Sequence, residues 1–569
     1  MPTLHQYDYL FAIGTIFAFL DAWNIGANDV ANSFATSVGS RSLTLKQALM
    51  IATVMEFAGS MAVGARVADT IRTKVISTKL FKNDPAVLML GMVCAVIGSS
   101  IYLTIATRLS MPVSTTHSIM GGVIGVGIAA VGVHGVNWGW SGVSQVFAAW
   151  AIAPGIAGCF GAIIFLITKY LVMRRNKPAT KAVWTVPVYF FLTSSLLALL
   201  IVWKGGSAKI KLTNPQVGGV IVGTGAVVSL LVTIFFVPYL YRKIVLGDWE
   251  LHYWHIPQGP LLLRRGEIPP KPTNHVGIKN YYEGHLTKEQ LAAKRAAEGH
   301  SNDVESHPPI AAEEKNGSSS DVADHPEAIP TNQLYTKSSD SPRPAGPWFK
   351  PTVAFWLVKR AILHGAEVDV VGLQSKRDFL SGDLEEMHAT GEHFDNEAEY
   401  VFSSLQVLTA ATSSFTHGAN DVANAIGPYT TIYFIWSSGQ LKDKVPVPYW
   451  ILAFGGGAIV IGLWTYGYNI MKALGNKITL HSPSRGFSME LGSAITVIMA
   501  TRLKLPISTT QCIAGATVGV GLCNGTWRTI NWRMVAWIYF GWIITLPVAG
   551  LISGCLMGIV LNAPHFGKK

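Results

Sequence analysis

Long apolar stretches separated by short polar segments run through most of this 569-residue chain. Seven of them predict helices in the first part, at about 8–38, 43–68, 87–107, 112–133, 141–172, 183–203 and 216–241. Five more follow at about 400–435, 447–473, 487–502, 507–523 and 533–561. Many approach or exceed the roughly 20 residues that a helix needs to cross a bilayer. The pattern predicts an all-α polytopic membrane protein with about 12 transmembrane segments, in contact with membrane lipid.

The composition supports a membrane protein. Half of the residues are hydrophobic and 14% are charged, whereas a soluble domain carries about 25% charged residues. The formal net charge of +11 comes from Lys and Arg scattered over loops and helix ends, which fits orientation in a membrane and gives no basic stripe for nucleic acid. The five cysteines are single, so neither a disulfide framework nor a cysteine metal site is expected. The first apolar run lacks a preceding basic region and is expected to be a retained helix.

A polar segment from about 242 to 399 interrupts the apolar pattern. Its Ser, Pro, Asp and Glu content predicts a largely disordered insertion. Short helices are expected within it at Leu286–Gly299 and, with an amphipathic pattern typical of a membrane surface, at about 348–366. The chain is therefore expected to comprise a first transmembrane repeat (1–172), connecting transmembrane helices (183–241), the insertion (242–399) and a second transmembrane repeat (400–569).

An internal repeat links the two membrane parts. GANDVAN occurs at 26–32 and again at 418–424, an offset of 392 residues. ATRLSMPVSTTHSIMGGVIGVGI at 106–128 matches ATRLKLPISTTQCIAGATVGVGL at 500–522, an offset of 394. An odd number of apolar segments precedes the second copy, so the two repeats are expected to have inverted topology. Inverted repeats with broken or re-entrant helices are typical of secondary transporters.

The distribution of Lys and Arg predicts the orientation. The densest short basic loop spans 174–181, and basic loops favour the cytosolic side. The large insertion lies two crossings later and is expected in the cytosol, with both termini outside.

The polar residues of GANDVAN are the first candidate site. Asn28 and Asp29, with Asn420 and Asp421, place hard oxygen ligands inside apolar segments, and glycine permits the helix to unwind there. Such a break is suited to a small cation such as sodium. The alternative is that these residues only cap a helix or bridge helices by hydrogen bonds.

The STT motif is the second candidate site. Each copy follows a proline and supplies three hydroxyl groups at the start of a glycine-rich helix: Ser114, Thr115 and Thr116, and Ser508, Thr509 and Thr510. Hydroxyls and unpaired N–H groups at a helix N-terminus favour an anion, although an ordinary N-cap is the alternative. An anion near Asp29 and Asp421 is repelled unless cations lie between them, which couples the binding of the two ions.

Two further carboxylates, Glu56 and Glu490, lie within apolar segments, where an acid is expected to be functional. They occupy different positions in the repeats. His117 follows the first STT, whereas Gln511 follows the second. Ser114 and His117 have no identifiable orienting acid, so a hydrolase is not expected.

These motifs resemble those of the inorganic phosphate transporter (PiT) family, in particular its fungal sodium-dependent members. The resemblance covers GANDVANSFATSVGSRSLTLKQA, PVSTTHSIMGGVIGVG, GANDVANAIGP and PISTTQCIAGATVGVG, and excludes the insertion. It implies that Asp29 and Asp421, with Asn28 and Asn420, serve the sodium and phosphate sites. It also implies that the six STT hydroxyls hold phosphate and that Glu56 and Glu490 belong with the sodium residues. A plasma-membrane homodimer with sodium as the coupling ion and no other cofactor is implied as well. Gln511 departs from relatives that carry His, so a proton-carrying His in both halves is not expected.

The sequence thus predicts a transporter, not an enzyme, that carries inorganic phosphate with sodium by alternating access. Coupling to protons and transport of another oxyanion such as sulfate stay open. A second class of function, a phosphate-sensing membrane receptor that signals through the insertion, also stays open.

Overall fold

Each predicted apolar segment coincides with a helix in the computed structural model. It describes residues 3–563 apart from 75–77, 82–83, 141, 203–211, 273–276, 305–343, 364–365, 367, 369, 375–378, 443–444, 504 and 506. The first part contains α1 (Asp8–Asn28), α2 (Val30–Gly39), α3 (Leu45–Lys74), α4 (Pro85–Arg108), α5 (Thr115–Val131), α6 (Val143–Thr168), α7 (Pro178–Leu200), α8 (Asn214–Leu231) and α9 (Val237–Leu240). The insertion contains α10 (Lys288–Val304), α11 (Pro351–Leu363), α12 (Val370–Gln374) and α13 (Leu384–Thr390). The second part contains α14 (Asn396–Ser438), α15 (Tyr449–Tyr466), α16 (Tyr468–Met471), α17 (Pro483–Arg502), α18 (Thr509–Leu522) and α19 (Trp532–Asn562).

The fold is all-helical over the described residues, which confirms the predicted class. Within these residues, 8 helical stretches are long and apolar enough to cross a membrane. They are His5–Gly39, Leu45–Ala65, Pro85–Arg108, Val143–Met173, Pro178–Leu200, Asn214–Val245, Tyr449–Tyr466 and Trp532–Asn562. Helix α5 is apolar but shorter. The count of about 12 crossings stays a prediction, because short paired helices need not cross.

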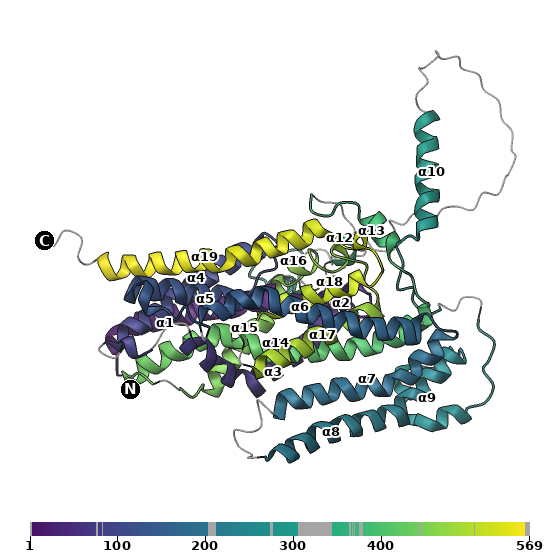
Figure 1. Ribbon diagram of the computed structural model, residues 1–569, viewed down its shortest axis with the longest axis horizontal. Helices are drawn as coiled ribbons and strands as arrows, with labels where there is room; N and C mark the ends of the chain where they lie inside the picture. The colour runs from purple at the N-terminus through teal and green to yellow at the C-terminus, as the bar shows by residue number, and fades with distance from the viewer. Residues whose placement is uncertain are drawn as a thin grey trace, which may run out of the picture.

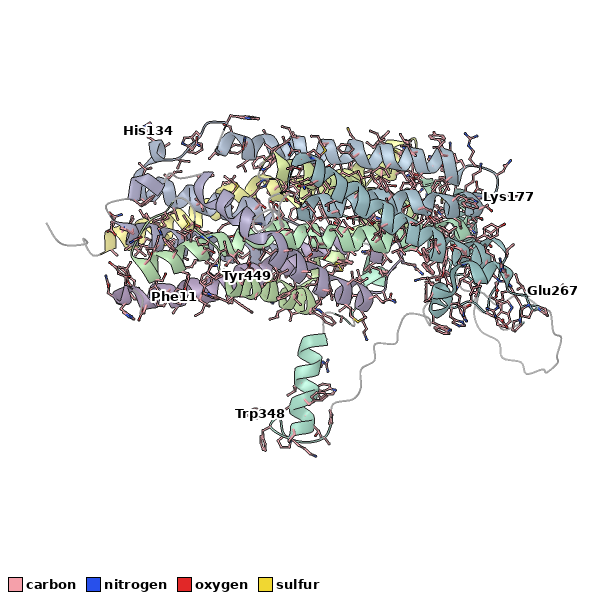
Figure 2. The ribbon with its side chains drawn as sticks, turned by 90° about the horizontal axis from the view of Figure 1, so that it is seen from below. Phe11, His134, Lys177, Glu267, Trp348 and Tyr449 are labelled. Carbon is pink, nitrogen blue, oxygen red and sulfur yellow. The ribbon has the colours of Figure 1, made fainter. Side chains whose placement is uncertain are left out.

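The helices form an elongated bundle, and different parts of the chain lie at its two ends (Figure 1). The start of α1 and the end of α19 lie toward one end, here called the terminal end, whereas α10 and α13 lie at the other, here called the insertion end. Figure 2 places His134, which follows α5, at the terminal end, and places Lys177 and Glu267 at the insertion end. Helix α11, which carries the predicted amphipathic pattern, projects from the side of the bundle next to Trp348.

The two STT helices point in opposite directions along the bundle. Helix α5 starts beside the first STT and ends near His134 at the terminal end (Figure 2). Helix α18 starts beside the second STT and ends at Leu522. The next residue, Cys523, accepts a hydrogen bond at 2.9 Å through its carbonyl oxygen from Lys169 Nζ, close in sequence to Lys177 at the insertion end. The two helix N-termini therefore face the middle of the bundle from opposite ends.

Matching glycines fix how these helices pack. Helix α5 packs on α19, and α18 packs on α6. A Cβ on Gly121 would lie 2.4 Å from the Leu546 carbonyl oxygen, and one on Gly515 would lie 2.2 Å from that of Pro154. These two contacts are related by the sequence repeat. Glycines after each STT are therefore positions of close helix packing.

The glycine of GANDVAN is also a packing residue in both copies. A Cβ on Gly26 would lie 1.8 Å from the carbonyl oxygen of Ile459 in α15, and one on Gly418 would lie 2.3 Å from that of Glu56 in α3. Real Cβ atoms do not approach backbone oxygen so closely, so each helix pair depends on the absence of a side chain. Glycine serves close approach here, in addition to any role in unwinding.

We expect Gly26→Ala to destabilise the protein by about 1–3 kcal/mol or more, because the added methyl group forces α1 and α15 apart. The matched control is Gly457→Ala in α15, where a Cβ would meet nothing within 4 Å. Thermal unfolding of the two variants in detergent checks this expectation. Equal unfolding temperatures for both variants would contradict it.

The segment before α10 and helix α13 pack against each other and the bundle, whereas α10 and α11 project from it (Figures 1 and 2). Tyr282 donates its hydroxyl to Glu399 in α14 at 2.7 Å, and His285 lies 3.1 Å from His388 in α13. The predicted helix at Leu286–Gly299 is confirmed by α10. The prediction of disorder includes residues 305–343, which lie outside the described residues.

Candidate functional site

Asp29 is held by hydroxyl groups from both repeats. It lies between α1 and α2, is 1% exposed, and keeps helical backbone angles, so the predicted helix break is one residue long. Thr115 donates to its Oδ2 at 2.5 Å, and Thr510 donates to its Oδ1 at 2.7 Å. Thr115 begins α5 and Thr510 lies in the first turn of α18. One carboxylate therefore joins the two STT motifs.

Asp421 occupies the matching place in the second repeat. Thr509 donates to its Oδ2 at 2.7 Å, as Thr115 does to Asp29, and Asn420 donates to its Oδ1 at 2.8 Å. The predicted helix break at the second GANDVAN is wrong, because α14 continues through it without interruption. Helix α14 packs along α3, and this contact supports the continuous helix.

The last asparagine of each GANDVAN crosses to the other repeat. Asn32 donates to Thr510 at 2.8 Å, and Asn424 donates to Thr116 at 3.1 Å. These two bonds are related by the repeat offsets, as are the Thr115–Asp29 and Thr509–Asp421 bonds. The four motifs thus form one buried network at the centre of the bundle. Asn32 and Asn424 were not among the predicted site residues, although both lie inside the motif.

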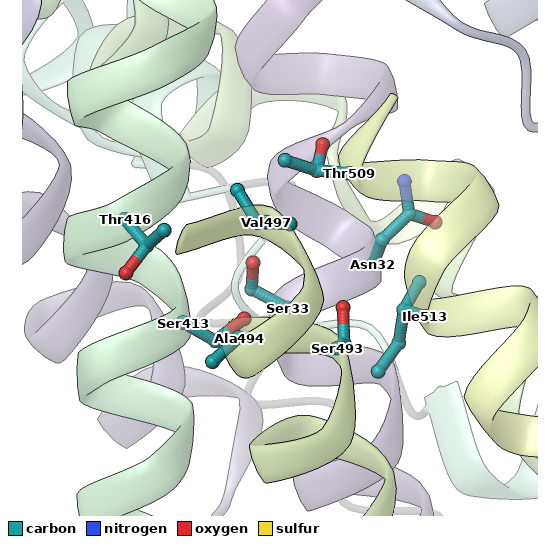
Figure 3. Close-up of a pocket in the computed structure, with 9 residues that line it drawn as sticks. All are labelled: Asn32, Ser33, Ser413, Thr416, Ser493, Ala494, Val497, Thr509 and Ile513. Carbon is teal, nitrogen blue, oxygen red and sulfur yellow. The ribbon is translucent and has the colours of Figure 1, made fainter. Parts of the chain in front are cut away.

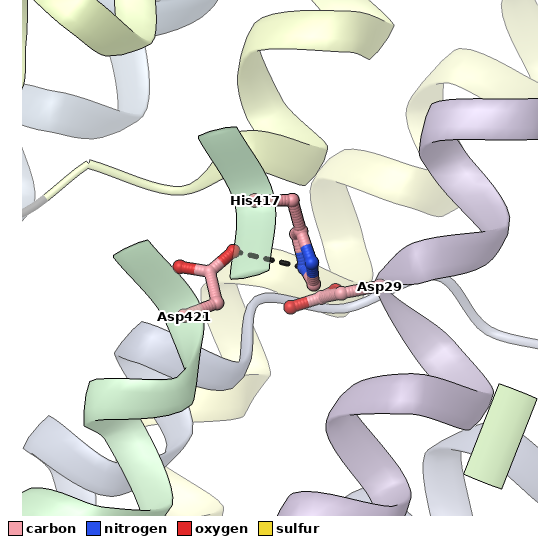
Figure 4. Close-up of side chains that lie close together, drawn as sticks. All are labelled: Asp29, His417 and Asp421. Carbon is pink, nitrogen blue, oxygen red and sulfur yellow. Dashed lines mark ion pairs between the residues drawn. The ribbon is translucent and has the colours of Figure 1, made fainter. Parts of the chain in front are cut away.

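Asp29 and Asp421 meet at a candidate cation centre with His417 (Figure 4). One ligand atom from each of these three side chains lies within 4.8 Å of the others, and all three are buried. Two carboxylates at that distance repel by about 3 kcal/mol or more at an effective dielectric constant of about 20. Carboxylate oxygens are the preferred donors for small hard cations. The pair therefore fits a cation such as sodium.

His417 is a further site residue that was not predicted from the sequence. Its Nδ1 lies 2.8 Å from Glu56 Oε2, and its Nε2 lies 3.0 Å from Asp421 Oδ2. It precedes the second GANDVAN, and the first copy carries Ile25 at that position. That difference between otherwise matching copies was the available signal. Through His417, the structure connects the predicted residue Glu56 to the centre.

Glu490 lies apart from the pair of aspartates. It accepts hydrogen bonds from Thr36 at 2.5 Å and Ser37 at 2.6 Å in α2, and from Thr409 at 2.6 Å in α14. Gln406 also donates to it at 3.0 Å. This carboxylate joins α17 to α2, which follows Asp29, and to the part of α14 that precedes Asp421.

Three predicted residues hold the local backbone. Ser114 and Ser508 accept the N–H groups of His117 at 3.2 Å and Gln511 at 3.4 Å, which is the N-cap alternative. Asn28 faces the loop before the first STT, donating to the Met111 carbonyl oxygen at 3.0 Å and accepting from Val113 N–H at 3.1 Å. The structure therefore does not place the Asn28 side chain with Asp29.

A polar cavity adjoins this network on the side of the second repeat (Figure 3). Asn32, Ser33, Ser413, Thr416, Ser493 and Thr509 line it together with apolar groups. Because α18 starts at Thr509, the cavity lies at the N-terminus of a helix, where an anion is favoured. A helix end suited to an anion thus lies beside a candidate cation centre.

Comparison with known proteins identifies the family. The profile of the Phosphate transporter family matches residues 25–553, which include both copies of each motif. The chain belongs to this family. Among curated relatives of this family member, Phosphate-repressible phosphate permease pho-4 of Neurospora crassa is 61% identical over 99% of both chains. Sodium-dependent phosphate transporter 1 of Mus musculus is 28% identical, with 97% of this chain and 96% of the relative covered.

A solved structure titled "The sodium-dependent phosphate transporter" matches the same family member along its length. It is 26% identical and aligns with a TM-score of 0.58 over 97% of this chain and 99% of the other. The similarity covers both halves of the bundle, so the central network lies inside a shared fold.

Proposed function

We propose that this protein carries inorganic phosphate across the plasma membrane by sodium-coupled symport with alternating access. The observation that carries the proposal is the central network, in which Asp29 binds hydroxyl groups from both STT motifs and lies beside Asp421. The printed names of the relatives, a phosphate permease and sodium-dependent phosphate transporters, support phosphate as substrate and sodium as coupling ion.

The chemistry of coupling follows from charge. Phosphate binds at the N-termini of α5 and α18, where the helix dipoles favour an anion. Thr115, Thr509 and Thr510 donate to the aspartates in this structure, and in the proposal their hydroxyl groups turn to phosphate when sodium binds the aspartates. The buried aspartates repel phosphate, and sodium at Asp29 and Asp421 removes that repulsion. Each ion therefore binds better when the other is present, which is the requirement for symport.

The two repeats supply the two access states in this proposal. They have inverted topology, with 1–172 and 400–569 as the transporting halves and 183–241 as connecting helices. The opposite directions of α5 and α18 support this assignment. The insertion lies in the cytosol and both termini lie outside.

Uptake of labelled phosphate into proteoliposomes tests the proposal. We expect an inward sodium gradient to drive uptake and an inward proton gradient without sodium to fail. His417, held between two carboxylates, favours proton coupling as the second candidate. If the proton gradient without sodium drives uptake as well as the sodium gradient does, sodium coupling is wrong and proton coupling is selected. No uptake with either gradient would overturn symport. Sulfate in place of phosphate is the control for substrate class.

A further inference from the structure

The cavity in Figure 3 has a counterpart position in the first repeat. The offset of 392 residues relates Ser413 and Thr416 of α14 to Asp21 and Asn24 of α1. The offset of 394 relates Ser493 of α17 to Ser99 of α4. The same helices that form a polar cavity in one half therefore meet again in the other half, with a carboxylate and an amide in place of hydroxyl groups.

The two related regions differ in packing. Ser413 is half-buried, and Thr416 and Ser493, which also line the cavity, are 2% and 3% exposed, whereas Asp21, Asn24 and Ser99 are all 0% exposed. The cavity side belongs to α14 and α17, and the closed side belongs to α1 and α4. Alternating access exchanges such a pair of regions, so the closed region opens when the cavity closes.

The closed region holds polar oxygens without partners among the described residues. Asp21 Oδ2 and Asn24 Oδ1 are buried and accept no hydrogen bond there. Both side chains contact Ser100: its Oγ lies 3.5 Å from Asp21 Oδ1, and its carbonyl oxygen accepts from Asn24 Nδ2 at 3.3 Å. In the part of the chain that the structure describes, Asp21 forms no ion pair with Lys, Arg or His. A buried carboxylate without a compensating charge is costly, which favours a bound cation.

These residues also lie in line with the central site. Asp21, Asn24 and Asn28 share one face of α1 at spacings of three and four residues. Asn24 donates to Thr104 at 2.9 Å and Asn28 donates to Thr107 at 2.9 Å, so polar contacts with α4 continue toward Asp29. Polar contacts between α1 and α4 therefore link the closed region to the central site.

We propose that Asp21, Asn24 and Ser100 form a second sodium site, which loads the cation from the terminal end before it reaches Asp29 and Asp421. This inference rests on the proposed sodium-coupled function. The neutral Ser413 and Thr416 in the related cavity hold sodium more weakly, which favours release at the insertion end. This difference in sodium binding between the two halves favours sodium movement from the terminal end to the insertion end, which two identical repeats would not do.

The test measures sodium dependence from each side of the membrane. Full-length protein is reconstituted in vesicles selected for one orientation, and initial rates of labelled phosphate transport are recorded against sodium at either face. We expect Asp21→Asn to raise the half-saturating sodium concentration at the terminal face by about tenfold, as for loss of one nearby opposite charge. The value at the insertion face is the internal control and should not change.

Two further variants test the second sodium site. Asp21→Ser introduces the residue found at the related position 413, and it replaces Asp21→Asn in the test if the Asn variant folds poorly. Ser413→Asp should lower the half-saturating sodium concentration at the insertion face. Unchanged sodium dependence in transport-competent Asp21 variants, or a shifted pH profile alone, would overturn the second site while leaving symport intact. Failure of the unmodified protein to transport with sodium would instead overturn the proposed function.

Discussion

Asp29→Asn should reduce sodium-driven phosphate uptake by about a hundredfold or more, and Asp421→Asn should do the same. Asp29 binds Thr115 and Thr510 from the two repeats, and Asn removes its negative charge. Breaking a buried charged contact costs about 3–5 kcal/mol, and about 1.4 kcal/mol corresponds to a factor of ten. Initial rates of labelled phosphate uptake into proteoliposomes, normalised to the amount of reconstituted protein, check the expectation.

The matched control for these variants is Glu267→Gln, the same loss of one carboxylate at an exposed position in the insertion (Figure 2). It should transport like the unmodified protein. Normal sodium-driven uptake by Asp29→Asn would show that this carboxylate only holds the helices together. Loss of uptake with an unchanged thermal unfolding temperature would separate ion binding from folding.

Much of this site could be predicted because it is duplicated. A single Asp in an apolar helix has several explanations, but GANDVAN and STT recur with nearly equal offsets, so their proximity follows from topology alone. The structure brings Asp29 and Asp421 together with Thr115, Thr509 and Thr510, in agreement with that argument. The helices could also be predicted from the sequence, because length and apolar pattern decide which segments can span a bilayer.

The rest depends on contacts between distant helices. The second GANDVAN stays helical because α14 packs along α3, which a local rule about glycine does not include. His417 lies outside both motifs, and its role depends on α3, which brings Glu56 beside it. Asn28 turned away from the cation centre because its amide satisfies the backbone of the loop before STT. In each case the local sequence is compatible with more than one structure, and contacts with distant helices determine which one forms.

His417→Ile should be the most destabilising change in the central network. The variant copies Ile25 of the first repeat and removes the imidazole between Glu56 and Asp421, which are 0% and 1% exposed. Two buried carboxylates then lack their shared partner, and removing one member of such a group costs about 3–5 kcal/mol. Thermal unfolding in detergent should show a clear fall in the unfolding temperature.

A double variant distinguishes this electrostatic effect from loss of packing volume. Glu56→Gln removes one of the two stranded charges, so the combination His417→Ile with Glu56→Gln should unfold at a higher temperature than His417→Ile alone. Groups in contact show coupling of about 0.5–3 kcal/mol in such cycles, whereas independent sites add. Additive losses would mean that His417 stabilises only by filling space. Recovery would mean that the carboxylates of α3 and α14 are tolerated at this depth because His417 bridges them, beside the place where the central cation is proposed to bind.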